Sequence, residues 1–237
     1  STLATGEKGR EAVQGSQAGS GEISVTSVKP NFASSFPGPA IGGATLDVAL
    51  NALYATPTAL STTLSASGGV VTAAVAGGPT HAFADGLIDR LTVGGTTAGS
   101  TLAIDYSGGV PYAGGVTFSP PAATGGASNT LILGGGNFTQ QAYLASGPGA
   151  GSIVFPNRTV GSATLTNIVD FSNLSPIIDT VPVAGYTFTS QAGAQTIEVE
   201  PGPVISGTQT TRISSTTGAF ERVDFAKIGR ASCRERV

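Results

Sequence analysis

The chain contains one cysteine, one histidine, no tryptophan and no methionine, and only 11% of its residues are charged. A single histidine and the absence of a Gly-x-Ser-x-Gly motif leave no basis for a Ser-His-Asp hydrolase. The glycine-rich stretches lack the Lys-Ser or Lys-Thr pair of a phosphate-binding loop. No apolar run approaches the roughly 18–20 residues that span a bilayer. Sparse charge combined with abundant glycine, serine and threonine is atypical of a cytosolic enzyme.

The last eleven residues, Lys227–Val237, distort the composition and need separate treatment. Their sequence is the translation of a common short-read sequencing adaptor in one reading frame. We therefore interpret them as an adaptor artefact, not as a natural basic arm, and exclude them from fold reasoning. The segment contains Cys233, the only cysteine, and four basic residues against Glu235. Without it the net charge changes from −3 to −6, and no native disulfide or thiol is expected.

The remaining chain divides into two parts. Residues 1–21 are rich in Gly, Ser and Gln without apolar periodicity, and we interpret them as a linker or an unpaired end. Residues 22–226 are expected to form a β-repeat region, and a hydrophobic content of 40% is enough to bury a core. Within that region, leucines at helical spacing before Thr56-Pro57 predict one short helix over Asp47–Ala55.

Short strands separated by glycine-rich turns dominate the chain from residue 61 onward. Leu102, Ile104 and Tyr106, for example, are expected to face one side of a strand, and the residues between them the other. Strands begin about every 10–16 residues, as in a β-solenoid or a β-sandwich. Three features favour the β-solenoid over the β-sandwich. Thr and Ser dominate the outward positions, glycine pairs recur at corners, and tryptophan is missing. The sequence therefore predicts an all-β fold, a right-handed parallel β-helix-like β-solenoid, with β-sandwich modules as the alternative.

Three stretches carry a family resemblance, namely Leu102–Phe118, Ser128–Phe138 and Asp170–Thr180. Their motifs include an Asp-aromatic-Ser-Gly-Gly-x-Pro turn, a Gly-Gly-φ-x-Phe strand and a Leu-x-Pro-Ile-x-Asp element, where φ is apolar. In this order the motifs resemble a repeated module of very large secreted or cell-surface proteins of environmental bacteria, over about residues 85–226. The resemblance implies an extracellular, repetitive β architecture with no known catalysis.

Glu198 and Glu200 are the best pair of carboxylates for catalysis. They are two residues apart, so both project from the same side of one strand. Polysaccharide lyases and hydrolases built on β-helices use paired carboxylates or a basic group. Two glutamates on an exposed edge strand also discourage edge-to-edge association, which is the simpler interpretation. The following Pro201-Gly202-Pro203 predicts the end of that strand.

Two sets of residues are candidate metal ligands. His81, Asp85 and Asp89 are four residues apart, so a helix would place them on one face. The turn-forming Asp85-Gly86 pair favours a solvated loop instead. Asp105 and Asp170 could hold calcium, but the Gly-Gly-x-Gly-x-Asp repeat of calcium-binding proteins is absent. Capping of turns by these two side chains is the preferred interpretation.

The expected function follows from composition and resemblance together. Nucleic-acid binding is disfavoured because the net charge is −6 and only seven basic residues, well separated, precede the adaptor segment. We expect a non-catalytic structural or adhesive segment of a secreted or cell-surface bacterial protein, in contact with surface polysaccharide or with neighbouring repeats of the same chain. The alternatives are a carbohydrate-active β-helix enzyme fragment and a calcium-stabilised adhesion module. No cofactor is expected, except calcium under the last of these alternatives, and no membrane span is expected.

Overall fold

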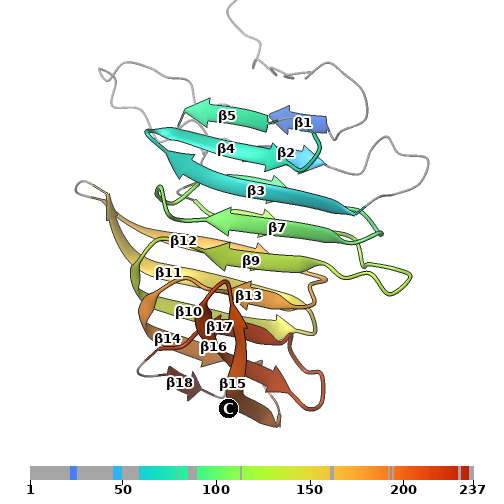
Figure 1. The fold of residues 1–237 in the computed structure, drawn as a ribbon, viewed down its shortest axis with the longest axis vertical. Coiled ribbons are helices and arrows are strands. Elements are labelled where there is room, and N and C mark those ends of the chain that lie inside the picture. Colours follow the sequence, from blue (N-terminus) through green and yellow to red (C-terminus); the bar gives the residue numbers. More distant parts are fainter. Residues whose placement is uncertain are drawn as a thin grey trace, which may run out of the picture.

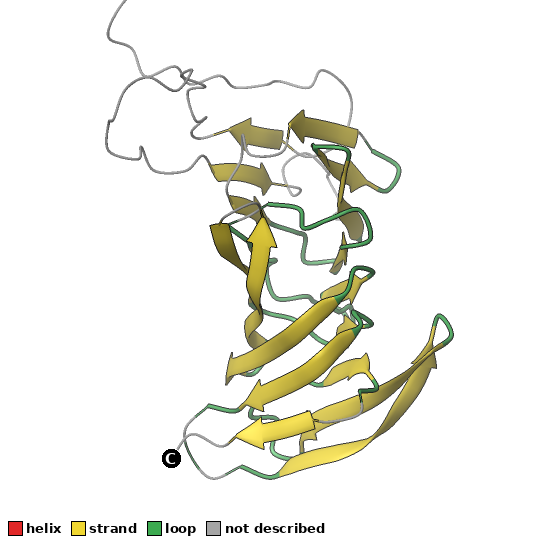
Figure 2. Ribbon diagram, turned by 90° about the vertical axis from the view of Figure 1, so that its left-hand side faces the viewer, coloured by secondary structure: helices red, strands yellow, loops and turns green. Residues whose placement is uncertain are grey.

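The computed structural model describes residues 22–25, 45–49, 59–78, 80–84, 90–112, 114–160, 163–191, 193, 195–228 and 231–234. Within these ranges the chain forms eighteen strands and no helix, which confirms the all-β class (Figure 1). The strands lie across the long axis of the molecule and follow one another along it (Figure 2). The described residues accordingly contain no helical segment that could cross a membrane.

The strands form two open sheets, each with parallel and antiparallel neighbours. Sheet A contains, in spatial order, β1 (Glu22–Val25), β2 (Thr45–Ala49), β6 (Arg90–Val93), β8 (Val116–Phe118), β12 (Ala163–Phe171), β11 (Ala150–Val160), β10 (Phe138–Gly147), β14 (Val183–Thr189) and β18 (Ala231–Arg234). Sheet B contains β15 (Ile197–Ile205), β16 (Thr208–Ser215), β17 (Val223–Ala226), β13 (Ile177–Asp179), β9 (Thr130–Gly134), β7 (Ser100–Asp105), β3 (Leu60–Ser67), β4 (Val70–Val75) and β5 (Thr80–Ala84).

The chain alternates between the sheets, and from β6 to β9 each crossing adds a parallel strand. From β6 to β9 it passes from sheet A to sheet B, back to sheet A and again to sheet B. As a result β6 and β8 are parallel neighbours, and so are β7 and β9. In sheet B the parallel series continues through β3, β7, β9, β13 and β17.

Antiparallel meanders of three strands interrupt this alternation. We call β10–β11–β12 the central meander and β15–β16–β17 the outer meander; β3–β4–β5 is built in the same way. From β9 the chain runs to β10 and returns through β11 to β12, beside β8. Strands β13 and β14 then pair with β9 and β10. The central meander therefore has parallel neighbours on both sides, whereas the outer meander ends sheet B at β15.

The core lies between the two sheets and is continuous along the stack. In sheet B, Leu102, Leu131, Ile177 and Val223 occupy equivalent inward positions on four consecutive parallel strands, and all four are buried. Aromatic rings join the sheets: the Tyr186 ring of sheet A stacks on a sheet B phenylalanine, at 4.0 Å between centroids. Stacking equivalent strands thus buries each apolar row against the next.

The predicted alternation at β7 is confirmed, because Leu102, Ile104 and Tyr106 are buried while Asp105 between the last two is exposed. The predicted helix over Asp47–Ala55 is wrong at its start. Its first three residues belong to β2, which pairs in parallel with β6, and the rest of it lies outside the described residues. Pairing with a neighbouring strand outweighs three leucines at helical spacing, since local propensity is weaker than tertiary context.

The predicted end of the strand at Pro201-Gly202-Pro203 is also wrong. Strand β15 continues to Ile205, with a shift of register between Pro201 and Val204. Prolines are tolerated there because β15 is the edge strand, where the ladder needs fewer backbone donors. Strand β18 lies in the segment interpreted as adaptor.

Candidate functional site

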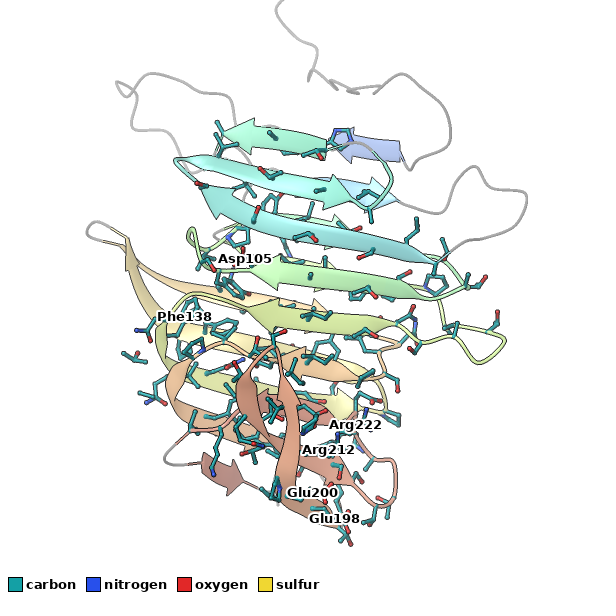
Figure 3. All side chains as sticks on the ribbon, in the orientation of Figure 1. Asp105, Phe138, Glu198, Glu200, Arg212 and Arg222 are labelled. Carbon is teal, nitrogen blue, oxygen red and sulfur yellow. The ribbon has the colours of Figure 1, made fainter. Side chains whose placement is uncertain are left out.

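Glu198 and Glu200 lie on the edge strand β15 with exposed side chains (Figure 3). Pairing with β16 places Glu200 opposite Arg212, and 3.9 Å separates Oε1 of Glu200 from Nη1 of Arg212. No lysine lies near the two glutamates in the sequence, and only the antiparallel pairing of β15 with β16 brings Arg212 beside them. An ion pair at this distance and exposure contributes little to stability.

Arg212 makes its stronger contact on the other side, with Asp224 of β17. Its Nε donates to Oδ1 at 2.7 Å and its Nη2 to Oδ2 at 3.1 Å, which is a two-point, charge-assisted contact. The hydrogen bond with Asp224 raises the pKa of Arg212. The Asp224 side chain is 5% exposed, and Nε of Arg222 lies 3.9 Å from its Oδ2. These contacts join the three strands of the outer meander.

The predicted metal ligands His81, Asp85 and Asp89 do not share a described helix. His81 is half-buried on strand β5, so the helical arrangement does not exist at that residue, and the predicted solvated loop is wrong there too. Burial lowers the pKa of His81. Asp85 and Asp89 lie outside the described residues. No three His, Cys, Asp or Glu side chains gather into a metal-binding group in the part of the chain that the structure describes.

Asp105 and Asp170 lie in different sheets and have different partners. Asp105 ends β7 and caps a turn as predicted, since its Oδ1 accepts a hydrogen bond from the Ser107 amide at 2.8 Å. Asp170 lies within β12 instead of in a turn, so the capping interpretation is wrong for it. It pairs with Arg90 of β6 and accepts a hydrogen bond from Ser152 Oγ at 2.6 Å. A carboxylate already engaged by a guanidinium is a poor calcium ligand.

The carboxylate with the most unusual surroundings, Asp179 of β13, was not among the candidates. Its side chain is fully buried, at an inward position between Leu133 and Phe225 of the neighbouring strands. The Gln141 amide and the Val181 backbone amide donate to it, the latter at 3.2 Å. Burial raises the pKa of Asp179 to about 7, although these two hydrogen bonds oppose the shift.

A signal for Asp179 exists in the sequence. In Ile177-Ile178-Asp179 the aspartate is two residues from a buried isoleucine, so period two places it on the same inward face. Its partner Gln141 also lies inward on β10, and the Gln141 Oε1 is buried without a hydrogen bond to the described residues. A protonated Asp179 could donate to that oxygen if the amide turned over. The pair can thus hold a proton inside the core.

A surface cavity of about 260 Å³ lies where β7 and β9 end and β10 begins. We call it the Phe138 cavity, and it is lined by Tyr106, Gly109, Val110, Gly136, Asn137, Phe138, Thr139 and Pro156. Figure 3 shows Phe138 and Asp105 near the same end of the sheets. Sequence reasoning missed it because its lining comes from three separate segments of the chain.

Comparison with protein-family models, with curated proteins and with solved structures gives no match for this chain. The resemblance to bacterial surface repeats therefore stays a prediction. What the geometry offers is a network of ion pairs at one edge, a proton-binding carboxylate in the core and one open cavity with a mixed lining.

Proposed function

We propose that this chain is a non-catalytic structural segment of a large extracellular bacterial protein, folded as a β-solenoid with antiparallel meanders inserted. One observation carries the architectural part, namely the parallel, in-register series β3, β7, β9, β13 and β17. In a solenoid each turn of the chain adds a strand beside its equivalent in the previous turn. The alternation of the chain between sheets A and B matches that arrangement.

The β-sandwich alternative accounts less well for the same pairings. Sandwiches of the immunoglobulin kind are built from antiparallel sheets with Greek-key connections. Here the antiparallel pairs outside the N-terminal β1–β2 pair are confined to the three meanders. The middle of sheet B, from β3 through β7, β9 and β13 to β17, is parallel throughout, which favours the solenoid.

A structural role fits the way the molecule uses its polar residues. Two of the charged contacts that the structure describes link strands to one another: Arg90 joins β6 to β12, and Arg212 joins β16 to β17. Stability in such a stack is close to a sum over neighbouring strands, so it can be extended without a large single core. This is the property that a spacer on a cell surface needs.

The enzyme alternative has one observation in its favour, which is the basic group of Arg212 beside Glu200. If the pair were catalytic, Glu198→Gln with Glu200→Gln would abolish release of reducing sugar from polysaccharide substrates. Under the proposed structural role neither the unchanged chain nor this variant releases sugar above a buffer blank. Release by the unchanged chain, lost in the variant, would establish the enzyme instead.

The most direct test of the proposed function is recovery of the complete native gene with long sequencing reads. We expect an export signal and further copies of the Asp-aromatic-Ser-Gly-Gly-x-Pro and Leu-x-Pro-Ile-x-Asp motifs in one long reading frame. We also expect native residues in place of Lys227–Val237. A short reading frame without an export signal or further copies would overturn the proposal.

A further inference from the structure

The Phe138 cavity is assembled from three parts of the chain that the fold brings to one place. The loop after β7 contributes Gly109 and Val110, the turn between β9 and β10 contributes Gly136 and Asn137, and β11 contributes Pro156. The cavity therefore exists only when sheets A and B are both in place.

The aromatic wall of the cavity is held rigidly. The Phe138 ring lies 5.4 Å from the Tyr106 ring in an edge-to-face arrangement and 4.6 Å from the Phe155 ring. The Tyr106 hydroxyl donates to Asn167 Oδ1 at 3.2 Å, which fixes that ring in turn. Because Gly136 has a φ of +67° and a Cβ there would lie 3.1 Å from Phe138, glycine allows the turn to pass close to the ring. A ring fixed before binding loses little entropy on binding.

The lining specifies the chemistry of a ligand. None of its eight residues is charged, so the cavity suits a neutral molecule. Phe138, Val110 and Pro156 present apolar surface, while the exposed side chains of Asn137 and Thr139 offer hydrogen-bond donors and acceptors. The Asn137 side chain makes no hydrogen bond within the part of the chain that the structure describes. A pyranose ring combines one apolar face with hydroxyls around its rim.

Size points to the same class of ligand. A volume of about 260 Å³ lies just below the roughly 300–1,000 Å³ of sites for drug-sized molecules, so it admits a single ring. We propose that the Phe138 cavity binds one pyranose unit of an extracellular polysaccharide. This rests on the proposed function, because it gives the surface segment a specific adhesive contact.

The test is a titration of the 15N-labelled chain with the methyl glycosides of glucose, galactose and mannose, followed by backbone amide shifts. We expect saturable shifts at Asn137, Phe138 and Thr139 with at least one of the three. Replacing Phe138 by Ala, or Asn137 by Ala, should weaken binding about tenfold or more, equivalent to about 1.4 kcal/mol. The matched control is Phe83→Ala, a half-buried phenylalanine on β5 outside the cavity, which should leave binding unchanged.

Two results would overturn the proposal: no saturable shift at these amides with any of the three glycosides, or binding that survives both substitutions. Because Asn137 is exposed, its replacement separates loss of a contact from loss of the fold, and a thermal melt of each variant checks the latter. Failure here leaves the strand ladders and the spacer function untouched. The spacer function has its own test, which is whether the recovered gene encodes an export signal and further repeats.

Discussion

The central and outer meanders have the same three-stranded antiparallel form but very different surroundings. The central meander lies between β8 and β14, and its inward side chains Tyr143, Ile153, Phe155 and Val169 are all fully buried. Among the described strands the outer meander has a neighbour on one side only, and Val199 and Val204 of its edge strand are 53% and 64% exposed. The position of each meander in the stack, not its local sequence pattern, decides how much of its side-chain surface is buried.

One buried aspartate, Asp179 of β13, faces the central meander and another, Asp224, belongs to the outer meander, and their partners differ. Asp179 faces the central meander and receives hydrogen bonds from uncharged amides, Gln141 and Val181. Asp224 in the outer meander is held by Arg212. Burying a carboxylate without a counter-charge raises its pKa. A carboxylate paired with a guanidinium instead forms a charge-assisted contact between two strands. The interior thus contains a proton-binding group, Asp179, and the edge contains the Arg212–Asp224 ion pair, which we call the ionic clamp.

The largest expected effect comes from removing the charge of Asp179. Its pKa is raised from 3.8 to about 7, so between these values the folded chain keeps a proton that the unfolded chain has lost. Stability therefore falls as pH rises through this window, by on the order of 4 kcal/mol at most. Asp179→Asn should remove this loss, so that the variant is more stable than the unchanged chain at pH 8 and similar to it at pH 4.

Urea denaturation at the two pH values measures this difference, with Asp105→Asn as a control for removing an exposed carboxylate. Equal stability of Asp179→Asn and the unchanged chain at pH 8 would show that Asp179 is not buried as a charge. The result would also remove the main contrast between the two regions.

The ionic clamp of the outer meander gives the next effect. Arg212→Met leaves Asp224 buried with its two-point contact gone, and we expect a loss of about 2–3 kcal/mol in the free energy of unfolding. Arg222→Met is the matched control, because Arg222 is more exposed and 3.9 Å from Asp224. We expect that variant to change stability by about 0.5 kcal/mol or less. Equal losses in the two variants would contradict the two-point contact.

Identical substitutions in the two meanders sharpen the contrast further. Val169→Ala in β12 removes two buried methyl groups and should cost about 2 kcal/mol. Val199→Ala in β15 removes exposed surface and should change stability by about 0.5 kcal/mol or less. Urea denaturation of both variants decides the point, and a larger cost at Val199 would mean that the outer meander is covered in solution.

The smallest expected effect is that of chelation. With Asp105 capping a turn and Asp170 paired with Arg90, the structural account predicts the same melting temperature with and without EDTA. A drop of several degrees on adding EDTA, reversed by calcium, would support the calcium-stabilised alternative instead.

Local pattern predicted the strands but not their neighbours. The alternation of Leu102 and Ile104 is a property of a few adjacent residues, so it could be interpreted directly. The return of the chain from β10 to β12 depends on which strands pair with each other. The alternation of inward and outward residues along a strand does not specify its pairing partner. The helix expected over Asp47–Ala55 failed for the same reason, since pairing with β6 decides the structure of its first residues.

The candidate sites show the same division between features that local spacing predicts and features that depend on strand pairing. The shared orientation of Glu198 and Glu200 follows from their spacing, whereas the approach of Arg212 needs the pairing of β15 with β16. The residue type alone does not predict a buried Asp179, because carboxylates are rarely buried, although its spacing from Ile177 places it inward. The Phe138 cavity could not be found from sequence, because three distant segments form it.

The central claim is that the middle of sheet B, from β3 to β17, is a parallel, in-register ladder, and a pair of engineered cysteines tests it directly. In a Cys233→Ser background, Ala103→Cys and Ile132→Cys occupy facing positions on β7 and β9. Neighbouring strands lie about 4.8 Å apart, within the reach of a disulfide. The account predicts rapid oxidation of this pair and slow oxidation of Ala103→Cys with Thr130→Cys, which is offset by two residues. Equal rates, or faster bonding of the offset pair, would contradict the ladder.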